Sequence, residues 1–424
     1  MIEHYEADLQ ETWYSAVLEN GLTVVLFRKP LFVSSCAILA ARCGSFDHIL
    51  EDDYGHRMTL PYGTAHFLEH KMFESRGSDA MKEFSLLGAS VNAWTSLEET
   101  AYYFTCQDPD ISRPLKLLLE LGQTFDISED SVEKEKGIIL EELHSYQQDP
   151  DTCLMQETMR SLYHKHPIRE DVTGTDNSIR QMKRDDLWQL FQAAYHPSHM
   201  VLVIVSPEDP NVLLSLIENE ERHFSFPLQS HMHRVIEPET DPVAPEKILH
   251  MDTQTPRQML GYRLPLSIGT AKDALEQEWQ LRMILESVFT PLSPQYQSWI
   301  DEKKISPLFG WDLSIERNLS YLTFFDETAG DDFRSFIQSK LESIKGNGVD
   351  EEILQQLKKR ALGDAIQNFN DPVSMAMSAL EGELEGVSMF DELAIVRSLN
   401  APGCMHAFEK LDLSDSTLTK ILPD

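Results

Sequence analysis

The chain has 424 residues, 42% of them hydrophobic, and its 36 basic and 70 acidic side chains give a formal net charge of −34 at pH 7. This acidity argues against nucleic acid as a ligand, because phosphate binding requires a basic surface. The length predicts two or more domains with their own cores, and since no apolar stretch nears ~20 residues we expect no membrane span.

The first predicted elements are strands. Apolar stretches at 13–18 and 22–27 flank Asn20-Gly21, a strong signal for a hairpin turn, and another apolar strand is expected at 34–41. The remaining elements of the first half follow from hydrophobic periodicity. They are helices at about 62–75 and 79–87, strands near 89–95 and 100–107, helices at about 110–124, 128–147, 153–164 and 183–194, a strand near 199–205 and a helix over 211–222.

The helix expected at 62–75 carries the stretch His66-Phe67-Leu68-Glu69-His70, which has the pattern H-x-x-E-H. Two histidines four residues apart lie on one face of a helix and can hold one metal ion together. Glu69 projects from nearly the same face, so it is placed to take a proton from water bound to that metal. Two ordinary histidines on an amphipathic helix are the alternative, which the position of Glu69 disfavours.

A hydrolytic zinc site needs a third protein ligand and leaves its fourth position to water. The acid-rich helix expected at 128–147 is the best source of that ligand. Glu135 and Glu142 are seven residues apart on it, which is two turns, and therefore face the same way. Because Lys134 and Lys136 interleave the acids, a solvated face of salt bridges is the alternative interpretation.

The second half repeats the order of elements without the metal motif. The stretch 224–246 is rich in Pro, His and acidic residues, has no periodicity and is expected to be an interdomain linker. Strand-like sequence follows from Ile248 to Leu264. The expected continuation is helices at about 271–288 and 294–303, strands at about 308–316 and 319–326, and then helices interrupted at Asp371-Pro372.

Ordered blocks of sequence carry a resemblance to a known family. The blocks are Asn20 to Val24, Gly44-Ser45, Gly63 to His70, Phe73, Gly88 to Ser96, Glu99-Thr100, Tyr102-Tyr103, Val132 to Glu142 and Tyr195 to Met200. Through them the chain resembles the pitrilysin family of inverzincin metallopeptidases, which includes insulin-degrading enzyme and the mitochondrial processing peptidase. As a half-size chain it is similar to the zinc-bearing subunit of the processing peptidase.

The resemblance implies an α+β fold of two homologous domains, each a mostly antiparallel sheet packed against helices. The expected ranges are a zinc-binding catalytic domain at 1–223, the linker at 224–246, and a homologous C-terminal domain without metal at 247–424.

The resemblance also implies the site residues. His66, His70 and Glu142 match the ligands of one Zn²⁺ ion per chain. Glu69 matches the general base, and Glu135 matches a second acid of the catalytic group that supports the ligands.

A third set of residues is assigned to substrate. Asn92, Ala93 and Thr95 match an edge strand whose backbone pairs with a substrate peptide, a physically sensible role because an added strand is recognised through its main chain. An ordinary strand turn is the alternative. On this resemblance we expect a zinc-dependent endopeptidase that cleaves peptides or small unfolded polypeptides. The alternative is a non-hydrolytic, peptide-binding or structural subunit, although such subunits typically lose a ligand or the general base.

One stretch departs from the family pattern. The second domain of the family usually offers an Arg, with a Tyr seven residues later, that reach the substrate carbonyl. The matching stretch 296–310 contains no Arg, and no Tyr after Tyr296. Either this pair is dispensable or a second chain supplies it. We expect the second case, a heterodimer with a zinc-less paralogue that provides the Arg and Tyr, with a homodimer as the alternative.

The net charge bears on the preferred substrate, and the cysteines bear on the cellular location. Acidic walls would steer basic peptides toward a peptidase site, but the same charge can serve only for solubility. The cysteines are odd in number and scattered, without metal or disulfide spacing, so we expect buried or idle thiols and a cytoplasmic location. They are Cys36, Cys43, Cys106, Cys153 and Cys404.

Overall fold

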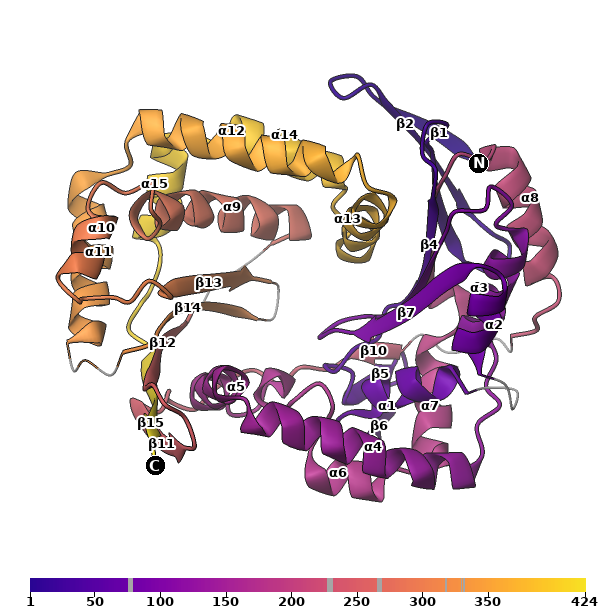
Figure 1. Cartoon of the computed structure of the whole chain (residues 1–424), viewed down its shortest axis with the longest axis horizontal. Coiled ribbons are helices and arrows are strands. Elements are labelled where there is room, and N and C mark those ends of the chain that lie inside the picture. Colours follow the sequence, from indigo (N-terminus) through magenta and orange to yellow (C-terminus); the bar gives the residue numbers. More distant parts are fainter. Residues whose placement is uncertain (75–78, 227–231, 265–268, 317–318, 329, 331) are drawn as a thin grey trace. The chain divides into compact units, whose positions relative to one another are not determined.

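The computed structural model describes residues 1–74, 79–226, 232–264, 269–316, 319–328, 330 and 332–424 (Figure 1). Within these residues the chain forms two compact units, each assembled from three segments. The first unit comprises Met1–His144, Glu170–Ile236 and Gln367–Met389, and the second comprises Ser145–Arg169, Glu237–Ile366 and Phe390–Asp424.

The first unit is built on a seven-stranded sheet in the order β1-β2-β3-β9-β4-β8-β7. Neighbouring strands are antiparallel, except that β3 and β9 are parallel. A smaller sheet has the order β10-β5-β6. The strands are β1 (Ile2–Glu6), β2 (Glu11–Val17), β3 (Thr23–Arg28), β4 (Ser35–Ala41), β5 (Ile49–Asp52), β6 (Arg57–Thr59), β7 (Ala89–Thr95), β8 (Thr100–Cys106), β9 (Met200–Ser206) and β10 (Met232–Arg234).

Helices pack around the larger sheet of the first unit. They are α1 (Thr64–Met72), α2 (Ala80–Leu86), α3 (Ser112–Gln123), α4 (Glu129–Gln148), α6 (Asp176–Gln181), α7 (Arg184–Ala194), α8 (Pro210–Glu221) and α13 (Pro372–Glu385), with a short 3₁₀ turn at Pro197–His199.

Both faces of this sheet are buried at its centre. Leu39 of β4 and Leu202 of β9 belong to the core cluster that also includes residues of α1, α3, α4 and α8. Side chains alternate along a strand, so Ile38 and Val203 point the other way, yet they too are fully buried. Helix α13 packs against β4 and β9 on that second face (Figure 1).

The second unit has a five-stranded sheet in the order β11-β15-β12-β14-β13, in which only β11 and β15 are parallel. One face carries the core shared with most of the helices, and α5 packs on the other face through Leu154. The elements are β11 (Glu246–Met251), β12 (Arg257–Arg263), β13 (Gly310–Ile315), β14 (Ser320–Asp326), β15 (Ser416–Pro423), α5 (Pro150–Leu162), α9 (Ala271–Val288), α10 (Tyr296–Asp301), α11 (Phe333–Asn347), α12 (Glu351–Asn368), α14 (Met389–Ser398) and α15 (Ala401–Glu409), with a 3₁₀ turn at Pro167–Arg169.

The expected fold class is confirmed, because both units are α+β with largely antiparallel sheets packed against helices. The strands that sequence periodicity missed are β1, β5, β6, β10 and β15. Four of them are short or mostly polar, such as Arg57–Thr59, and therefore lack an alternating apolar signal. No helix in the described ranges is long and apolar enough to cross a membrane.

The two units differ from the expected domain ranges in two segments. Helix α5 lies in the range expected for the first domain but belongs to the second unit. Helix α13 lies in the range expected for the C-terminal domain but belongs to the first unit. The physical reason is that each sheet has a second apolar face, which a helix from the other half of the sequence covers. The expected linker also contains ordered structure, since Met232–Arg234 pairs with β5, while 227–231 lie outside the described residues.

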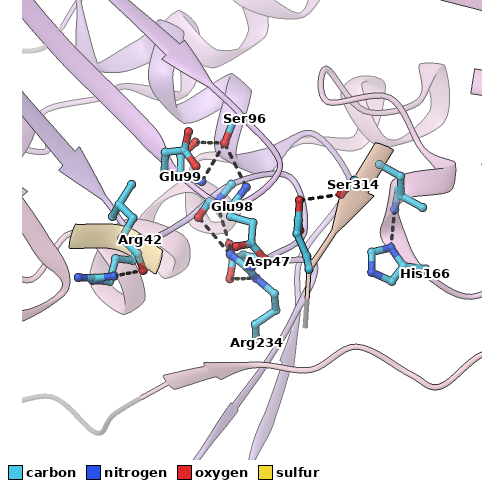
Figure 2. A network of polar contacts seen from close by, with 12 residues as sticks. Arg42, Asp47, Ser96, Glu98, Glu99, His166, Arg234 and Ser314 are labelled. Carbon is cyan, nitrogen blue, oxygen red and sulfur yellow. Dashed lines mark hydrogen bonds and ion pairs between the residues drawn. The ribbon is translucent and has the colours of Figure 1, made fainter. Parts of the chain in front are cut away.

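A half-buried arginine connects β10 with the loops around the larger sheet. Figure 2 shows Arg234 reaching both Asp47 and Glu98. Its guanidinium donates to Asp47 Oδ1 at 3.1 Å and to Oδ2 at 2.8 Å, and it also donates to the carbonyl oxygen of Glu98 at 3.1 Å. Because Glu98 lies in the turn that follows β7, Arg234 fixes the end of that edge strand.

Removing the charge of Arg234 is expected to destabilise the first unit. The substitution Arg234→Met leaves the buried Asp47 carboxylate without its cation, which costs about 3 kcal/mol of unfolding free energy. The control Arg180→Met breaks an exposed pair with Asp176 and is expected to cost less than about 1 kcal/mol. Native-state hydrogen exchange of peptides from β4 and β9 measures both. Equal effects for the two variants would contradict the expectation.

Candidate metal centre

Helix α1 presents the H-x-x-E-H motif from a buried position. It begins after Gly63, whose φ of 83° is left-handed, and a Cβ there would lie 2.2 Å from the carbonyl oxygen of Thr173. Only glycine therefore allows this approach. Phe67 and Leu68 turn into the core cluster, which orients the histidines and Glu69 toward α4 and β7.

Helix α4 supplies the acids that face this motif. Glu135 and Glu142 lie two turns apart and both approach α1, as the sequence spacing predicts. Val132 and Leu143 anchor the helix in the core cluster. Glu135 is buried and Glu142 is half-buried. The alternative interpretation, a solvated face of salt bridges, is therefore wrong for Glu135 and Glu142.

The side chains of the three predicted ligands converge. His66 Nε2 lies 3.7 Å from Glu142 Oε1, and His70 Nε2 lies 3.7 Å from Glu142 Oε2. One ligand atom from each of the three residues lies within 4.8 Å of the others. Two atoms bound at 2.0–2.1 Å to a tetrahedral ion are about 3.3–3.4 Å apart, so this set fits one zinc ion with a small closure.

The protonation state of His66 also suits a metal. Burial, together with the neighbouring His70, lowers the pKa of His66 to about 4, so this imidazole is neutral near pH 7. Neutral imidazole is the form that binds metal. For His70 burial acts to lower the pKa, but the hydrogen bond to Glu135 and the carboxylates of Glu69 and Glu142 outweigh it and raise the pKa.

Glu135 supports His70 from behind. Its Oε1 lies 3.1 Å from His70 Nδ1, and because a carboxylate only accepts, Nδ1 carries the hydrogen and Nε2 keeps its lone pair for a ligand bond. Its Oε2 accepts a hydrogen bond of 3.0 Å from Lys71. Burial acts to raise the pKa of Glu135, but these hydrogen bonds outweigh it and lower the pKa.

Glu69 lies beside the ligands and is held by a strand. It is 9% exposed, and its Oε2 accepts a hydrogen bond of 2.8 Å from the hydroxyl of Thr95 on β7. Burial raises the pKa of Glu69, while the Thr95 hydroxyl opposes that shift. A buried carboxylate with a raised pKa is a stronger base, which suits proton removal from water.

The expected substrate strand is an edge strand. Asn92, Ala93 and Thr95 all lie on β7, which ends the strand order of its sheet and pairs only with β8 among the described residues. An unpaired sheet edge is the kind of surface to which an extended peptide can add as a strand. The edge position is thus confirmed, and the role in substrate binding stays a prediction.

A cavity of about 930 Å³ opens beside the motif and is bounded by α1, α2, α4 and β7. Its volume is in the range of ligand pockets. Five carboxylates and neither Lys nor Arg stand among the described residues that line it. These are Glu69, His70, Phe73, Glu74, Asp79, Met81, Asn92, Asp126, Ser128, Ser131 and Glu135.

Two contacts of the site did not follow from the motif alone. The hydroxyl of Thr95 reaches Glu69 across 26 residues of sequence, which no local pattern reports. Lys71 did leave a signal, because it stands four residues after Phe67 and therefore on the buried stripe of its helix. A lysine on such a stripe requires a buried carboxylate nearby, and Glu135 is that partner.

Removing the hydroxyl of Thr95 is expected to weaken catalysis. Thr95→Val keeps the shape of the side chain but removes one charge-assisted hydrogen bond to Glu69, worth about 1.5 kcal/mol. We expect kcat/KM for a cleaved peptide to fall about tenfold. Thr105→Val on β8, whose side chain lies on the face opposite Tyr102, is the matched control. A kcat/KM for Thr95→Val equal to that of the control would contradict the assigned contact.

Two family models match the chain in succession. The model described as "Insulinase (Peptidase family M16)" matches residues 53–176, and the model described as "Peptidase M16 inactive domain" matches residues 181–361. The first match contains all the predicted metal ligands and Glu69.

Similar proteins carry protease names. "Uncharacterized zinc protease YmfH" of Bacillus subtilis (strain 168) is 29% identical over 418 residues, which cover 98% of this chain and 97% of that protein. "Probable mitochondrial-processing peptidase subunit beta" of Schizosaccharomyces pombe is 26% identical over 213 residues, which cover 49% of this chain and 45% of that protein.

Solved structures share the fold. The crystal structure of an "M16-like peptidase" from Alicyclobacillus acidocaldarius matches with a TM-score of 0.91 and 29% identity, over 97% of this chain and 98% of that chain. The periplasmic protease PqqL from Escherichia coli matches with a TM-score of 0.76 and 19% identity, over 97% of this chain and 47% of that chain. The second likeness concerns the fold alone.

Proposed function

Because the chain belongs to the M16 peptidase family, we propose that it is a zinc-dependent endopeptidase that cleaves peptides or small unfolded polypeptides. The observation that carries the proposal is the meeting of His66, His70 and Glu142 at one point, with Glu69 beside them. A subunit that only bound peptides would have no need of this complete set.

The chemistry divides between the metal and the side chains. His66, His70 and Glu142 would hold the zinc ion, which when bound would supply a water of lowered pKa and a Lewis acid for the substrate carbonyl. Glu69 takes the proton of the attacking water and returns it to the departing amine. Since Thr95 donates to Oε2 of Glu69, the carboxylate is oriented with Oε1 left for that proton.

The peptide is proposed to bind along β7. Its backbone pairs with Asn92, Ala93 and Thr95 as an added strand, so the same strand that holds the substrate also holds Glu69 through Thr95. The carboxylates that line the neighbouring cavity favour polar or basic side chains there.

A second chain is proposed to complete the site. The stretch 296–310 lacks the Arg and Tyr expected to reach the substrate carbonyl, and such donors contribute strongly to stabilising an oxyanion. We therefore favour a heterodimer with a zinc-less paralogue over a homodimer. The name of the Schizosaccharomyces pombe relative, a subunit, is consistent with this assembly. Co-expression with such a paralogue tests the proposal, and full activity of this chain alone would contradict it.

A peptide library tests the function most directly. The purified chain, with and without a zinc-less paralogue, is incubated with a mixed peptide library and the products are identified by mass spectrometry. We expect internal cleavage that is lost with a zinc chelator and restored by Zn²⁺. Intact peptides from the zinc-loaded chain in both preparations would overturn the proposed function.

A further inference from the structure

Lys71 is a buried cation next to a predicted metal ligand. It follows His70 directly in the sequence, and only 1% of its surface is exposed. Its ammonium lies 3.0 Å from Glu135 Oε2 and also donates to Glu74, whose side chain is 56% exposed. Burial of an ammonium group is costly unless it is paired, and the carboxylate of Glu135 provides that pairing.

The two oxygens of Glu135 have separate partners. Oε1 lies 3.1 Å from His70 Nδ1, and Oε2 lies 3.0 Å from Lys71 Nζ. The carboxylate is therefore fixed from both ends, and its side chain is 6% exposed. His66 has no such support, because its Nδ1 is buried without a hydrogen-bond partner among the described residues. His70 is thus the histidine whose ring is oriented by an outer carboxylate.

We propose that Lys71 is a positioning residue of the metal centre, which holds Glu135 against His70 and thereby orients His70 toward the ion. The inference rests on the proposed zinc function. His70 and Lys71, which are consecutive residues of α1, then have linked roles. His70 is the proposed ligand, and Lys71 holds the carboxylate of Glu135 that supports it. Without the ammonium, Oε2 of Glu135 would be buried without a donor, and the carboxylate would turn away from His70 to reach one.

The loss of Lys71 has two opposing effects on a bound cation. Removing a nearby positive charge favours binding, whereas losing the outer support of a ligand weakens it by about 10–100-fold. The positioning role requires the second effect to prevail. The sign of the change in affinity is therefore itself a test.

The experiment measures metal binding by the full chain rather than its activity. Affinity for Zn²⁺ is obtained by competition with a chromophoric chelator, and the visible absorption of bound Co²⁺ reports ligand geometry. For Lys71→Met we expect about tenfold weaker Zn²⁺ binding and a Co²⁺ spectrum shifted in the same way as that of Glu135→Gln. Lys136→Met, which removes a lysine paired with Glu133 on α4, is the matched control and should bind as the parent does.

The double variant keeps the test decisive even if Lys71→Met fails to fold. Combining Lys71→Met with Glu135→Gln removes both buried charges, and the result should match Glu135→Gln alone in affinity and spectrum. A further loss in the double variant, or unchanged or tighter binding by Lys71→Met, would overturn the inference. A parent chain that binds no Zn²⁺ would instead overturn the proposed function, so the two failures are distinguishable.

Discussion

Glu69→Gln is expected to lower kcat for peptide cleavage by about 10³-fold while zinc stays bound. Glutamine has the shape of glutamate but cannot accept a proton, and a positioned general base contributes about 10²–10⁴-fold. Thr95 can still donate to the amide oxygen of the glutamine, as it does to the carboxylate of Glu69, so the side chain keeps its place. Glu69 is not among the three residues whose ligand atoms converge, so the metal should remain.

The measurement pairs turnover with metal content. Peptide cleavage is followed by mass spectrometry on samples whose zinc has been determined by elemental analysis. Glu129→Gln, at the exposed start of α4, makes the same chemical change outside the site and should keep both zinc and turnover. Turnover by Glu69→Gln at the parent rate would refute the general-base role. Loss of zinc would show that Glu69 takes part in the binding set itself.

Spacing in the sequence predicted which side chains of the candidate metal centre share a helix face, because these side chains lie on two regular helices. Residues four apart and seven apart on a helix share a face whatever the rest of the fold does, so His66 and His70, and Glu135 and Glu142, could be paired from spacing. That the two faces meet could not be derived from either helix alone. Their approach depends on packing of both helices into one core cluster, and the family resemblance stood in for that information.

Helices α5 and α13 show what hydrophobic periodicity cannot predict, which is the unit that a helix joins. The hydrophobic pattern of an amphipathic helix predicts that one face is buried, but it does not predict which sheet that face packs against. The sequence of α5 therefore could not assign this helix to the second unit. The sequence predicted an apolar strand at 34–41, and β4 is buried on both faces in the structure, which requires a second layer over it. That layer proved to be α13, more than 300 residues later in the chain.

Glu142→Gln is expected to remove most of the zinc from the purified chain. Its two carboxylate oxygens each lie 3.7 Å from a different histidine nitrogen, so it closes the ligand set with both. It also brings the only negative charge among the three ligands, and a neutral amide cannot replace that attraction to a dication. The affinity should fall by more than the roughly 10–100-fold that loss of an outer support costs.

Elemental analysis after dialysis against a weak chelator separates this outcome from that of Glu69→Gln. Glu141→Gln is the matched control, since this exposed acid is the neighbour of Glu142 on the same helix and points about 100° away from it. The control should keep parent zinc. If Glu142→Gln kept it too, two histidines and water would suffice to hold the ion, and the third ligand would have to be sought elsewhere. If instead zinc were lost from both variants, the net charge of α4 rather than a defined ligand would be what holds the metal.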